Sequence, residues 1–207
     1  PMMVHDIKTQ ITSLLQERVL VIDGAMGTMI QGHRLATEDY HGLRFRDHSK
    51  DLKGANDLLC ITQPQIIEDI HLAYLHAGAD IIETNTFGGT PVVLDEYGLG
   101  SRAHEINLKA AQIARRAADK YSSTSKPRFV AGSVGPTTKA ISVTGGITFN
   151  SLKDNFYAQA KALIEGGVDY LLVETCQDTR NIKAALLAFD ELFEKLGYSI
   201  PVAVSGT

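Results

Sequence analysis

The 207-residue sequence has no tryptophan, only two cysteines and a net charge of just -4. The cysteines, Cys60 and Cys176, are too few for a disulfide scaffold and fit a reducing compartment. Acidic residues outnumber basic ones, 24 to 20, which argues against a nucleic-acid-binding surface. No apolar run reaches the length of a membrane span, and charged residues interrupt the N-terminal apolar pattern, so we predict no signal peptide. We therefore expect a cytoplasmic protein that contacts neither nucleic acid nor membrane.

The most informative stretch covers residues 19–28. Its first four residues, 19–22, are apolar and mostly β-branched, which predicts a strand buried on both faces as in a parallel sheet. Asp23 ends this strand, and Gly24 and Gly27 predict a tight turn whose N–H groups can approach an anion. Ligands of α/β proteins bind where strands end. The turn could therefore hold an amino acid by both ends, although an ordinary turn with a capping aspartate is the alternative.

Strands and helices alternate along the rest of the chain. A long loop is predicted at residues 30–60, which lack a clear period, and His33, His41 and His48 within it are expected to be exposed. Apolar stripes predict helices over about 4–18, 64–77, 102–120, 150–165 and 178–196, and short apolar runs predict strands over 80–86, 128–134, 169–175 and 201–206.

Residues 77–84 and 166–175 repeat one pattern: a helix end, glycine, aspartate, an apolar strand and Glu-Thr. Alternating strands and helices predict a parallel sheet, either a barrel or doubly wound. No Gly-x-Gly-x-x-Gly opens a helix, which favours the barrel. A (β/α)8 barrel needs eight strands and roughly 250 residues. We therefore expect residues 1–207 to form the N-terminal portion of a TIM-type α/β barrel, about five of eight strands, with a leading helix over 1–18. Uncovered sheet edges would then favour self-association.

Three acids, Asp23, Glu83 and Glu174, end corresponding strands of this predicted barrel. The ends of barrel strands converge on one mouth, so the three carboxylates could surround one cationic group. Each could instead cap a helix or pair with an arginine. A carboxylate pair for glycoside hydrolysis is a competing hypothesis. The absence of tryptophan, which would form a sugar platform, disfavours it.

Four segments carry a resemblance to a known family: Asp23–Gln31, Leu52–Leu59, Gly78–Phe87 and Gly135–Thr137. Together they resemble the homocysteine-binding module at the N-terminus of cobalamin-dependent methionine synthase (5-methyltetrahydrofolate–homocysteine methyltransferase). Leu52–Leu59 is more particular to methionine synthase than to other homocysteine methyltransferases. The sequence departs from the family at Ala25, where glycine is usual, and at Ala55, where asparagine is usual. A methyl group at position 25 would disfavour a positive φ.

The resemblance implies a barrel that binds homocysteine and zinc at its mouth. Zinc would favour the thiolate of homocysteine, which attacks the methyl group of methylcobalamin. The family's zinc-binding cysteines lie on later strands, beyond Thr207, so we expect no catalytic residue, no bound zinc or cobalamin and no methyl transfer from these residues alone.

The resemblance also assigns roles to residues of this sequence. It places the substrate ammonium against Asp23 and Glu174 and the substrate carboxylate against the backbone of three residues of the turn. Further pocket-lining roles fall to residues near the ends of the later strands. The turn residues are Gly24, Ala25 and Met26, and the further lining residues are Glu83, Asn85 and Ser133.

The implied partners are homocysteine, the rest of the barrel, and the folate and cobalamin domains of a longer chain. Two alternatives stay open. The chain could belong to a cobalamin-independent homocysteine S-methyltransferase that uses betaine, S-methylmethionine or a fused folate-reductase partner. It could also be an amino-acid-binding or scaffold domain without chemistry.

Overall fold

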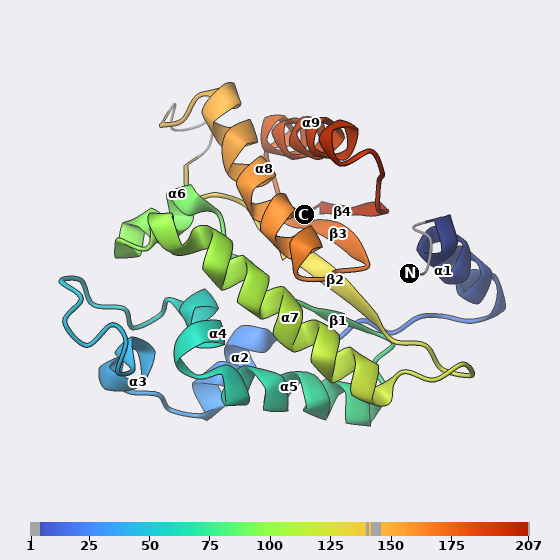
Figure 1. The fold of residues 1–207 in the computed structure, drawn as a ribbon, viewed down its shortest axis with the longest axis horizontal. Helices are drawn as coiled ribbons and strands as arrows, with labels where there is room; N and C mark the ends of the chain where they lie inside the picture. The colour runs from blue at the N-terminus through green and yellow to red at the C-terminus, as the bar shows by residue number, and fades with distance from the viewer. Residues whose placement is uncertain (1–4, 140, 142–145, 207) are drawn as a thin grey trace.

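The computed structural model describes residues 5–139, 141 and 146–206. Helices and strands alternate from β1 onward, as the sequence predicts (Figure 1). The elements, with short 3-10 helices labelled η, are α1 (His5–Glu17), α2 (Met26–Gly32), α3 (Thr37–His41), η1 (Asn56–Leu58), α4 (Leu59–Thr62), α5 (Pro64–Ala77), β1 (Ile81–Glu83), α6 (Pro91–Leu94), η2 (Asp95–Tyr97), η3 (Gly100–Arg102), α7 (Ala103–Tyr121), β2 (Phe129–Val134), α8 (Phe149–Glu165), β3 (Tyr170–Cys176), α9 (Thr179–Leu196) and β4 (Val202–Gly206).

Two of the sequence predictions concern positions outside the described residues. Thr207, beyond which the resemblance places the zinc-binding cysteines, is one of them. Residues 1–4, at the start of the predicted leading helix, are the other. The part of that helix that the structure describes is α1, which ends at Glu17, one residue before the predicted end.

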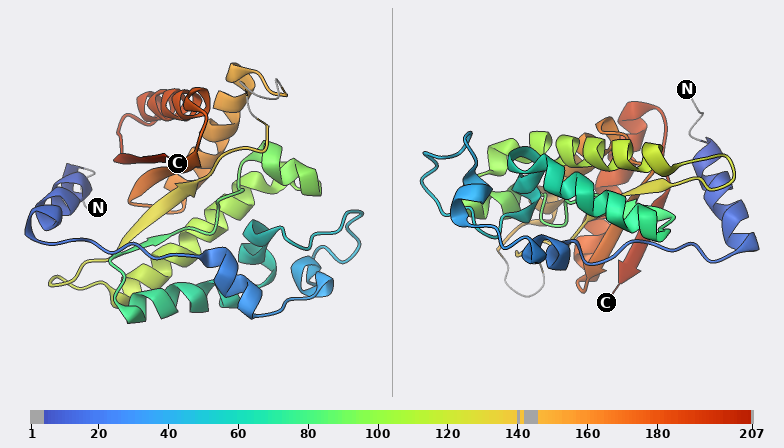
Figure 2. Two further views of the ribbon diagram at one scale, coloured as in Figure 1. Left: turned by 180° about the vertical axis from the view of Figure 1, so that it is seen from behind. Right: turned by 90° about the horizontal axis from the view of Figure 1, so that it is seen from below.

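The sheet has four parallel strands in the order β1-β2-β3-β4. Helices α5, α7, α8 and α9 follow one another along one side of it, and α1 lies apart from that row (Figures 1 and 2). Each outer helix leads into the next parallel strand of the sheet, which is the repeated step that builds closed barrels. The fold is therefore part of a (β/α)8 barrel, which confirms the predicted fold class.

The predicted first strand, residues 19–22, is only partly formed. Ile22 makes an isolated parallel bridge to Ile81, and the Val21 carbonyl accepts the N–H groups of Asp80 and Ile81 at 2.8 and 3.1 Å. Burial on both faces was wrong, because Val19 is 81% exposed and Val21 55%. The stretch lies at the edge of the described sheet with a neighbouring strand on one side only, so little covers its side chains.

The pleat of the strands separates two apolar layers. Side chains from alternate strand positions, such as Ile82 and Val130, point outward and pack against α7, α8 and α9. The intervening residues Phe129 and Tyr170 belong to an inner layer. The inner layer is covered by the apolar residues of α1, namely Ile7, Ile11 and Leu14. The leading helix therefore shields the inside of the partial barrel.

Residues 30–60 are only in part the loop that the sequence predicts, since residues 33–36 and 42–55 belong to no helix or strand. They contain the end of α2, all of α3 and η1, and the start of α4. Buried apolar residues of this segment, including Tyr40, Phe45 and Leu58, pack with α5 and the first half of α7 in a second core. No single helical period is visible in the sequence because the helices are only a few residues long.

The three histidines of this segment differ in their surroundings. His33 is exposed, as expected. His41 and His48 are half-buried, and their ring nitrogens lie 2.9 and 2.7 Å from the carbonyl oxygens of Thr37 and Tyr97. These two side chains therefore secure the segment, which corrects the expectation that they are exposed.

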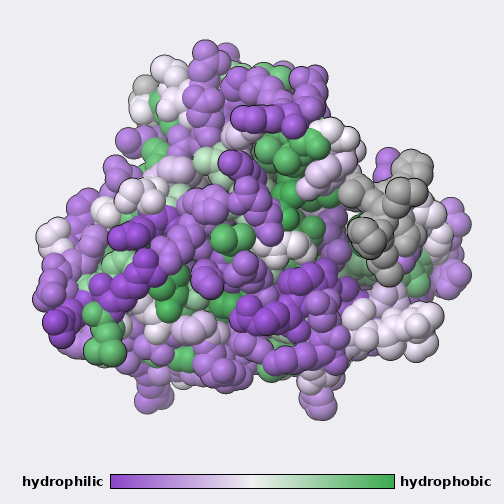
Figure 3. All heavy atoms as spheres, in the orientation of Figure 1, coloured by the Kyte–Doolittle hydropathy of each residue, from purple (hydrophilic) through white to green (hydrophobic). Residues whose placement is uncertain are grey.

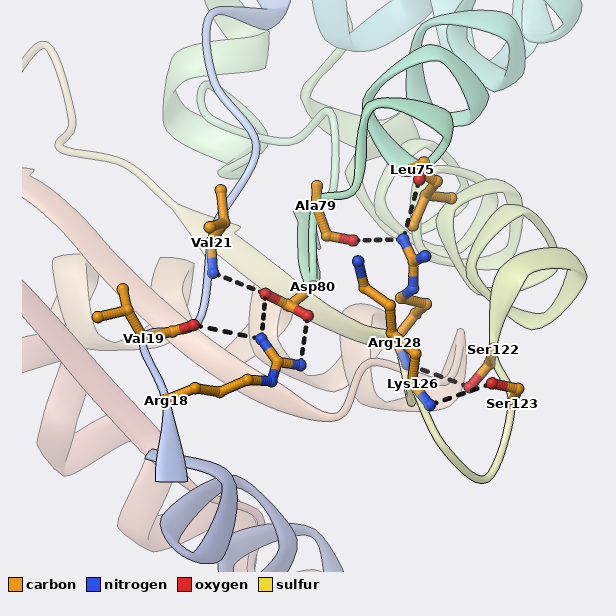
Figure 4. Close-up of polar contacts among 10 residues, drawn as sticks. All are labelled: Arg18, Val19, Val21, Leu75, Ala79, Asp80, Ser122, Ser123, Lys126 and Arg128. Atoms are coloured by element: carbon orange, nitrogen blue, oxygen red, sulfur yellow. Dashed lines mark hydrogen bonds and ion pairs between the residues drawn. The ribbon is translucent and has the colours of Figure 1, made fainter. Parts of the chain in front are cut away.

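Aspartates hold the N-terminal edge of the sheet together. Buried Asp80 accepts two hydrogen bonds from Arg18, at 2.9 and 2.7 Å, and one from the Val21 N–H (Figure 4). Asp169 repeats this arrangement between β2 and β3, with Arg115 and the Val130 N–H. The aspartate of the sequence repeat thus has a structural role, since it connects the start of β1 and of β3 to the neighbouring strand.

Near the Asp80–Arg18 ion pair, Arg128 donates to the carbonyl oxygens of Leu75 and Ala79 at 2.9 and 2.6 Å (Figure 4). These contacts satisfy carbonyl groups at the C-terminal end of α5 and just beyond it.

The face drawn in Figure 3 is mostly hydrophilic, with apolar residues in small groups. Within the described part of the chain, no helix combines the length and the apolar character that a membrane span requires.

His71 of α5 should make the protein less stable in mild acid. The side chain is completely buried, neither ring nitrogen has a hydrogen-bond partner among the described residues, and burial lowers its pKa to about 4. An unfolded chain takes up this proton near pH 6.5 and the folded chain does not, so stability falls as pH drops from 6.5 toward 4. The change His71→Leu should remove about 2 kcal/mol of the difference in unfolding free energy between pH 7 and pH 4.5.

Urea unfolding at both pH values measures this effect, with His33→Gln as the exposed-histidine control. Parallel pH slopes for the parent protein and His71→Leu would show that His71 is protonated in the folded state or hydrated.

Candidate functional site

Side chains that face the inside of the partial barrel meet at the C-terminal ends of the strands. Because side chains alternate along a strand, Glu83 shares the inward face with Ile81, and Glu174 shares it with Leu172. Ser133 occupies the same layer on β2. The apolar interior therefore ends in a polar layer at the edge where α/β proteins bind ligands.

This layer lines a pocket of about 340 Å³. Its size is within the range of small-molecule sites. All eight residues selected from the sequence line it, and the structure brings them together with Gly27, Thr84, Thr86 and Phe87; the eight are Asp23, Gly24, Ala25, Met26, Glu83, Asn85, Ser133 and Glu174.

Glu174 is aimed by an irregularity at the end of β3. The pairing of β3 with β4 shifts register between Glu174 and Cys176, and the intervening Thr175 has a φ of 57°. Such bulges redirect side chains next to binding sites, and a left-handed threonine is strained unless its surroundings hold it. The Ser133 hydroxyl donates a hydrogen bond to the Glu174 carboxylate. The carboxylate is thus fixed from its own strand and from the neighbouring one.

Asp23 enters the pocket from the edge of the sheet. Both of its carboxylate oxygens lie 3.1 Å from the Glu83 backbone nitrogen, which donates to them. Burial raises the pKa of Asp23 to about 7, and the negative charge of Glu174 adds to the shift, while the Glu83 N–H opposes it. Asp23 and Glu174 are therefore close enough to act on one ligand.

Glu83 lies between these two acids. Burial raises its pKa well above the usual range, and the charges of Glu174 and Asp23 and a hydrogen bond to Glu174 raise it further. No lysine, arginine or histidine is among the described residues that line the pocket. Crowded carboxyls without a positive partner favour binding of a cation from solution, because such a ligand would relieve their repulsion.

The turn after Asp23 differs from the sequence prediction. Among the described residues, neither Gly24 nor Gly27 has a positive φ, and a Cβ at Gly27 would meet nothing within 4 Å. Ala25 has a φ of -44°, so its methyl group causes no strain at this departure from the family. The turn leads directly into α2, whose start at Met26 has no side-chain cap. Uncapped N–H groups at a helix start suit a carboxylate.

The segment Leu52–Leu59 is hydrogen-bonded to the chain that forms one wall of the pocket. Asn85 donates to the carbonyl oxygen of Asn56 at 2.8 Å, and the Gly88 N–H donates to Asp57 at 3.2 Å. The Tyr40 hydroxyl donates to the Asn56 side chain at 3.0 Å. The segment singled out by the resemblance therefore holds the chain that follows β1, and with it the wall of the pocket.

The described residues do not form a zinc site. Cys60 and Cys176 are buried free thiols, neither lines the pocket, and burial raises the pKa of both. A cysteine binds zinc as the thiolate, which these surroundings disfavour. Within residues 5–139, 141 and 146–206, no group of three or more His, Cys, Asp or Glu side chains could hold a metal ion. No chemical step through zinc is therefore assigned to this part of the chain, and zinc-binding cysteines beyond Thr207 stay a prediction.

Sequence reasoning missed three lining residues, Thr84, Thr86 and Phe87. Thr84 belongs to the Glu-Thr pair of the sequence repeat, but its neighbour Glu83 is the stronger candidate for ligand binding because it carries a carboxylate at the end of a strand. Thr86 and Phe87 follow the strand, where side-chain alternation no longer predicts direction. Phe87 is 47% exposed, which is unusual for an aromatic residue and consistent with a pocket wall open to solvent.

The fold and the site together define the class of protein, a partial α/β barrel with an acidic pocket at the ends of its strands. The family model for homocysteine S-methyltransferase matches residues 20–207. The chain belongs to this family, which confirms the predicted kinship with homocysteine methyltransferases.

The fold is also similar to crystal structures of the homocysteine methyltransferase MmuM from Escherichia coli. The metallated and oxidized forms are each 23% identical with a TM-score of 0.68 over 90% of this chain, and the apo form is 22% identical with a TM-score of 0.66 over 94%. The chain covers 63%, 62% and 62% of those chains, respectively, which is less than two thirds of their length. At this identity the likeness concerns the fold.

Neutralising Glu83 should stabilise the protein at alkaline pH. A carboxyl with a raised pKa keeps its proton in the folded state, so stability falls as pH rises above the unfolded value near 4.5. The change Glu83→Gln should lessen this fall by on the order of 1 kcal/mol, a discounted figure because the pocket is open to solvent. Thermal unfolding at pH 5 and pH 8.5 measures it, and an unchanged pH difference would show that neither burial nor the neighbouring acids raise the pKa of Glu83 in the folded protein.

Proposed function

We propose that this chain is the homocysteine-binding part of a methionine synthase. In this proposal the pocket holds the ammonium group of homocysteine against Asp23 and Glu174. The backbone of Gly24, Ala25 and Met26, which leads into α2, receives the carboxylate. Glu83, Asn85 and Ser133 complete the wall. The proposal rests above all on one observation, the crowding of carboxyls with raised pKa values in a pocket whose described lining holds no cation.

The choice of methylcobalamin as methyl donor rests on the segment Leu52–Leu59. Its resemblance favours methionine synthase over cobalamin-independent relatives, and its hydrogen bonds to Asn85 and Gly88 connect it to the chain that forms one wall of the pocket. We assign substrate binding to residues 1–207. In this proposal the thiol-activating zinc and the corrin lie on other parts of a longer protein, and these residues alone transfer no methyl group.

Homocysteine binding can be measured by isothermal titration calorimetry at pH 7.5 under reducing conditions. The changes Asp23→Asn and Glu174→Gln should each weaken binding by about 10- to 100-fold, because each removes a charged hydrogen-bond partner of the ammonium group. Glu38→Gln is the matched control, since it makes the same charge change on an exposed residue of α3.

A second titration uses 4-mercaptobutanoate, which has the thiol and the carboxylate but no amine. Its affinity should be similar in the parent protein and in both pocket variants. Equal loss of affinity for both ligands would mean that the acids shape the pocket without contacting the amine. Absence of homocysteine binding would contradict the proposed function.

The affinity for homocysteine should fall as the pH drops below about 7. The ammonium group stays charged throughout, but Asp23 takes up a proton in this range because its pKa is raised to about 7. Titrations between pH 5.5 and 8.5 should show this loss in the parent protein and a flatter profile in Asp23→Asn. A profile that Asp23→Asn leaves unchanged would assign the titration to another group.

The methyl donor is tested with a longer protein that contains residues 1–207. Methionine formation from homocysteine is followed with methylcobalamin, S-methylmethionine or betaine supplied separately. Activity with methylcobalamin alone supports the proposal, and activity with either of the other donors supports a cobalamin-independent enzyme. Homocysteine binding without transfer from any donor would favour a binding domain.

A further inference from the structure

Two fully buried amides lie between the outer helices and the chain that follows β1. Gln159 of α8 donates to the Thr86 carbonyl oxygen at 2.8 Å and to the Asn107 side-chain oxygen at 3.1 Å. Asn107 of α7 donates to the carbonyl oxygens of Gly89 and Ala103, both at 2.7 Å. Both side chains are 0% exposed. They join α7 and α8 to the segment Thr84–Gly89.

The hydrogen bonds continue from Thr86 to the pocket. The Thr86 hydroxyl donates to the Ser133 carbonyl oxygen at 2.7 Å and lies 2.6 Å from the Thr84 hydroxyl. Because the Thr86 proton is already used, the Thr84 hydroxyl donates to Thr86, and it accepts the Ser133 N–H at 3.0 Å. The Ser133 hydroxyl then donates to Glu174. A buried polar chain thus connects Gln159 to a carboxylate of the pocket.

Gly89 shows how closely this arrangement is packed. A Cβ at this position would lie 2.5 Å from the Asn107 side-chain oxygen and 2.8 Å from the Gln159 side-chain nitrogen. Such distances are far below van der Waals contact, so the two amides and a larger residue exclude one another. Only a glycine therefore fits at position 89 while both amides keep their positions.

Stability alone does not explain the pair. The Gln159 side-chain oxygen is buried without a hydrogen-bond partner among the described residues, and an unpaired buried polar atom is costly. An apolar side chain of similar size would avoid that cost but could not bind Thr86. We infer that Gln159 and Asn107 are positioning residues, which fix the segment Thr84–Gly89 so that Asn85 and Phe87 form the wall of the homocysteine pocket. The ligand in this inference rests on the proposed function.

The variant Gln159→Leu removes both of the hydrogen bonds that Gln159 donates and keeps much of the volume. Its control is Asn181→Leu on α9, another buried amide outside the chain of hydrogen bonds, whose one side-chain hydrogen bond among the described residues is to Thr137 at 3.4 Å. We expect both variants to lose stability, and only Gln159→Leu to weaken homocysteine binding, by about tenfold or more. Equal affinities in the two variants, at temperatures where both are folded, would overturn the inference.

Hydrogen exchange supplies a readout that does not depend on the ligand. Faster exchange of the amides of residues 84–89 and Ser133 in Gln159→Leu, relative to Asn181→Leu, would support the positioning role even if the parent protein bound no homocysteine. In that case the proposed function alone fails, whereas unchanged local exchange contradicts the inference itself. Where Gln159→Leu does not fold, Gln159→Asn keeps the amide but withdraws it by one bond, and the same two readouts apply.

Discussion

The site depends on repulsion between carboxyl groups that the fold forces together. Parallel strands end at one edge, and the pleat turns Glu83 and Glu174 toward the same interior. Asp23 joins them and binds the Glu83 N–H. The described lining offers no positive side chain to offset their negative charge. A cationic ligand would therefore be attracted to the pocket, because its charge would reduce the repulsion between the carboxylates.

The two edges of the sheet use acids in opposite ways. At the start of the strands, Asp80 and Asp169 each bind an arginine and the N–H of a neighbouring strand, which stabilises the sheet. At the end of the strands, the acids bind no arginine among the described residues and face a pocket. Stability and binding are thus separated along each strand, as is usual for barrels of this type. The buried amides of α7 and α8 reach the binding edge from outside and couple its shape to the outer helices.

Much of the fold could be predicted from the sequence because each element carries its own signal. Proline begins α5, Asp178 caps α9, and the repeated Gly-x-Asp pattern begins β1 and β3. The helix predicted over about 150–165 begins at Phe149 and is capped by Thr148, a small shift of the kind that local patterns rarely resolve. The three acids of the pocket were predictable because strand-end positions follow from the strand pattern, and the turn after Asp23 was predictable from its glycines, while Asn85 and Ser133 came from the family resemblance.

Other features were not predictable, because they depend on contacts between distant segments. The exposure of Val19 reflects the edge position of its strand, and the order of residues 30–60 comes from packing against α5 and α7. Gln159 and Asn107 look like ordinary helix residues in the sequence. Only the packing of three elements reveals that their amides bind the chain behind the pocket.

A crystal structure of this chain with L-homocysteine bound tests the central claim most directly. The account predicts the ligand nitrogen at hydrogen-bond distance, about 3 Å, from carboxylate oxygens of both Asp23 and Glu174. The ligand carboxylate should lie against the backbone at the start of α2. Homocysteine bound with its nitrogen directed away from these acids, or bound outside the pocket, would contradict the account.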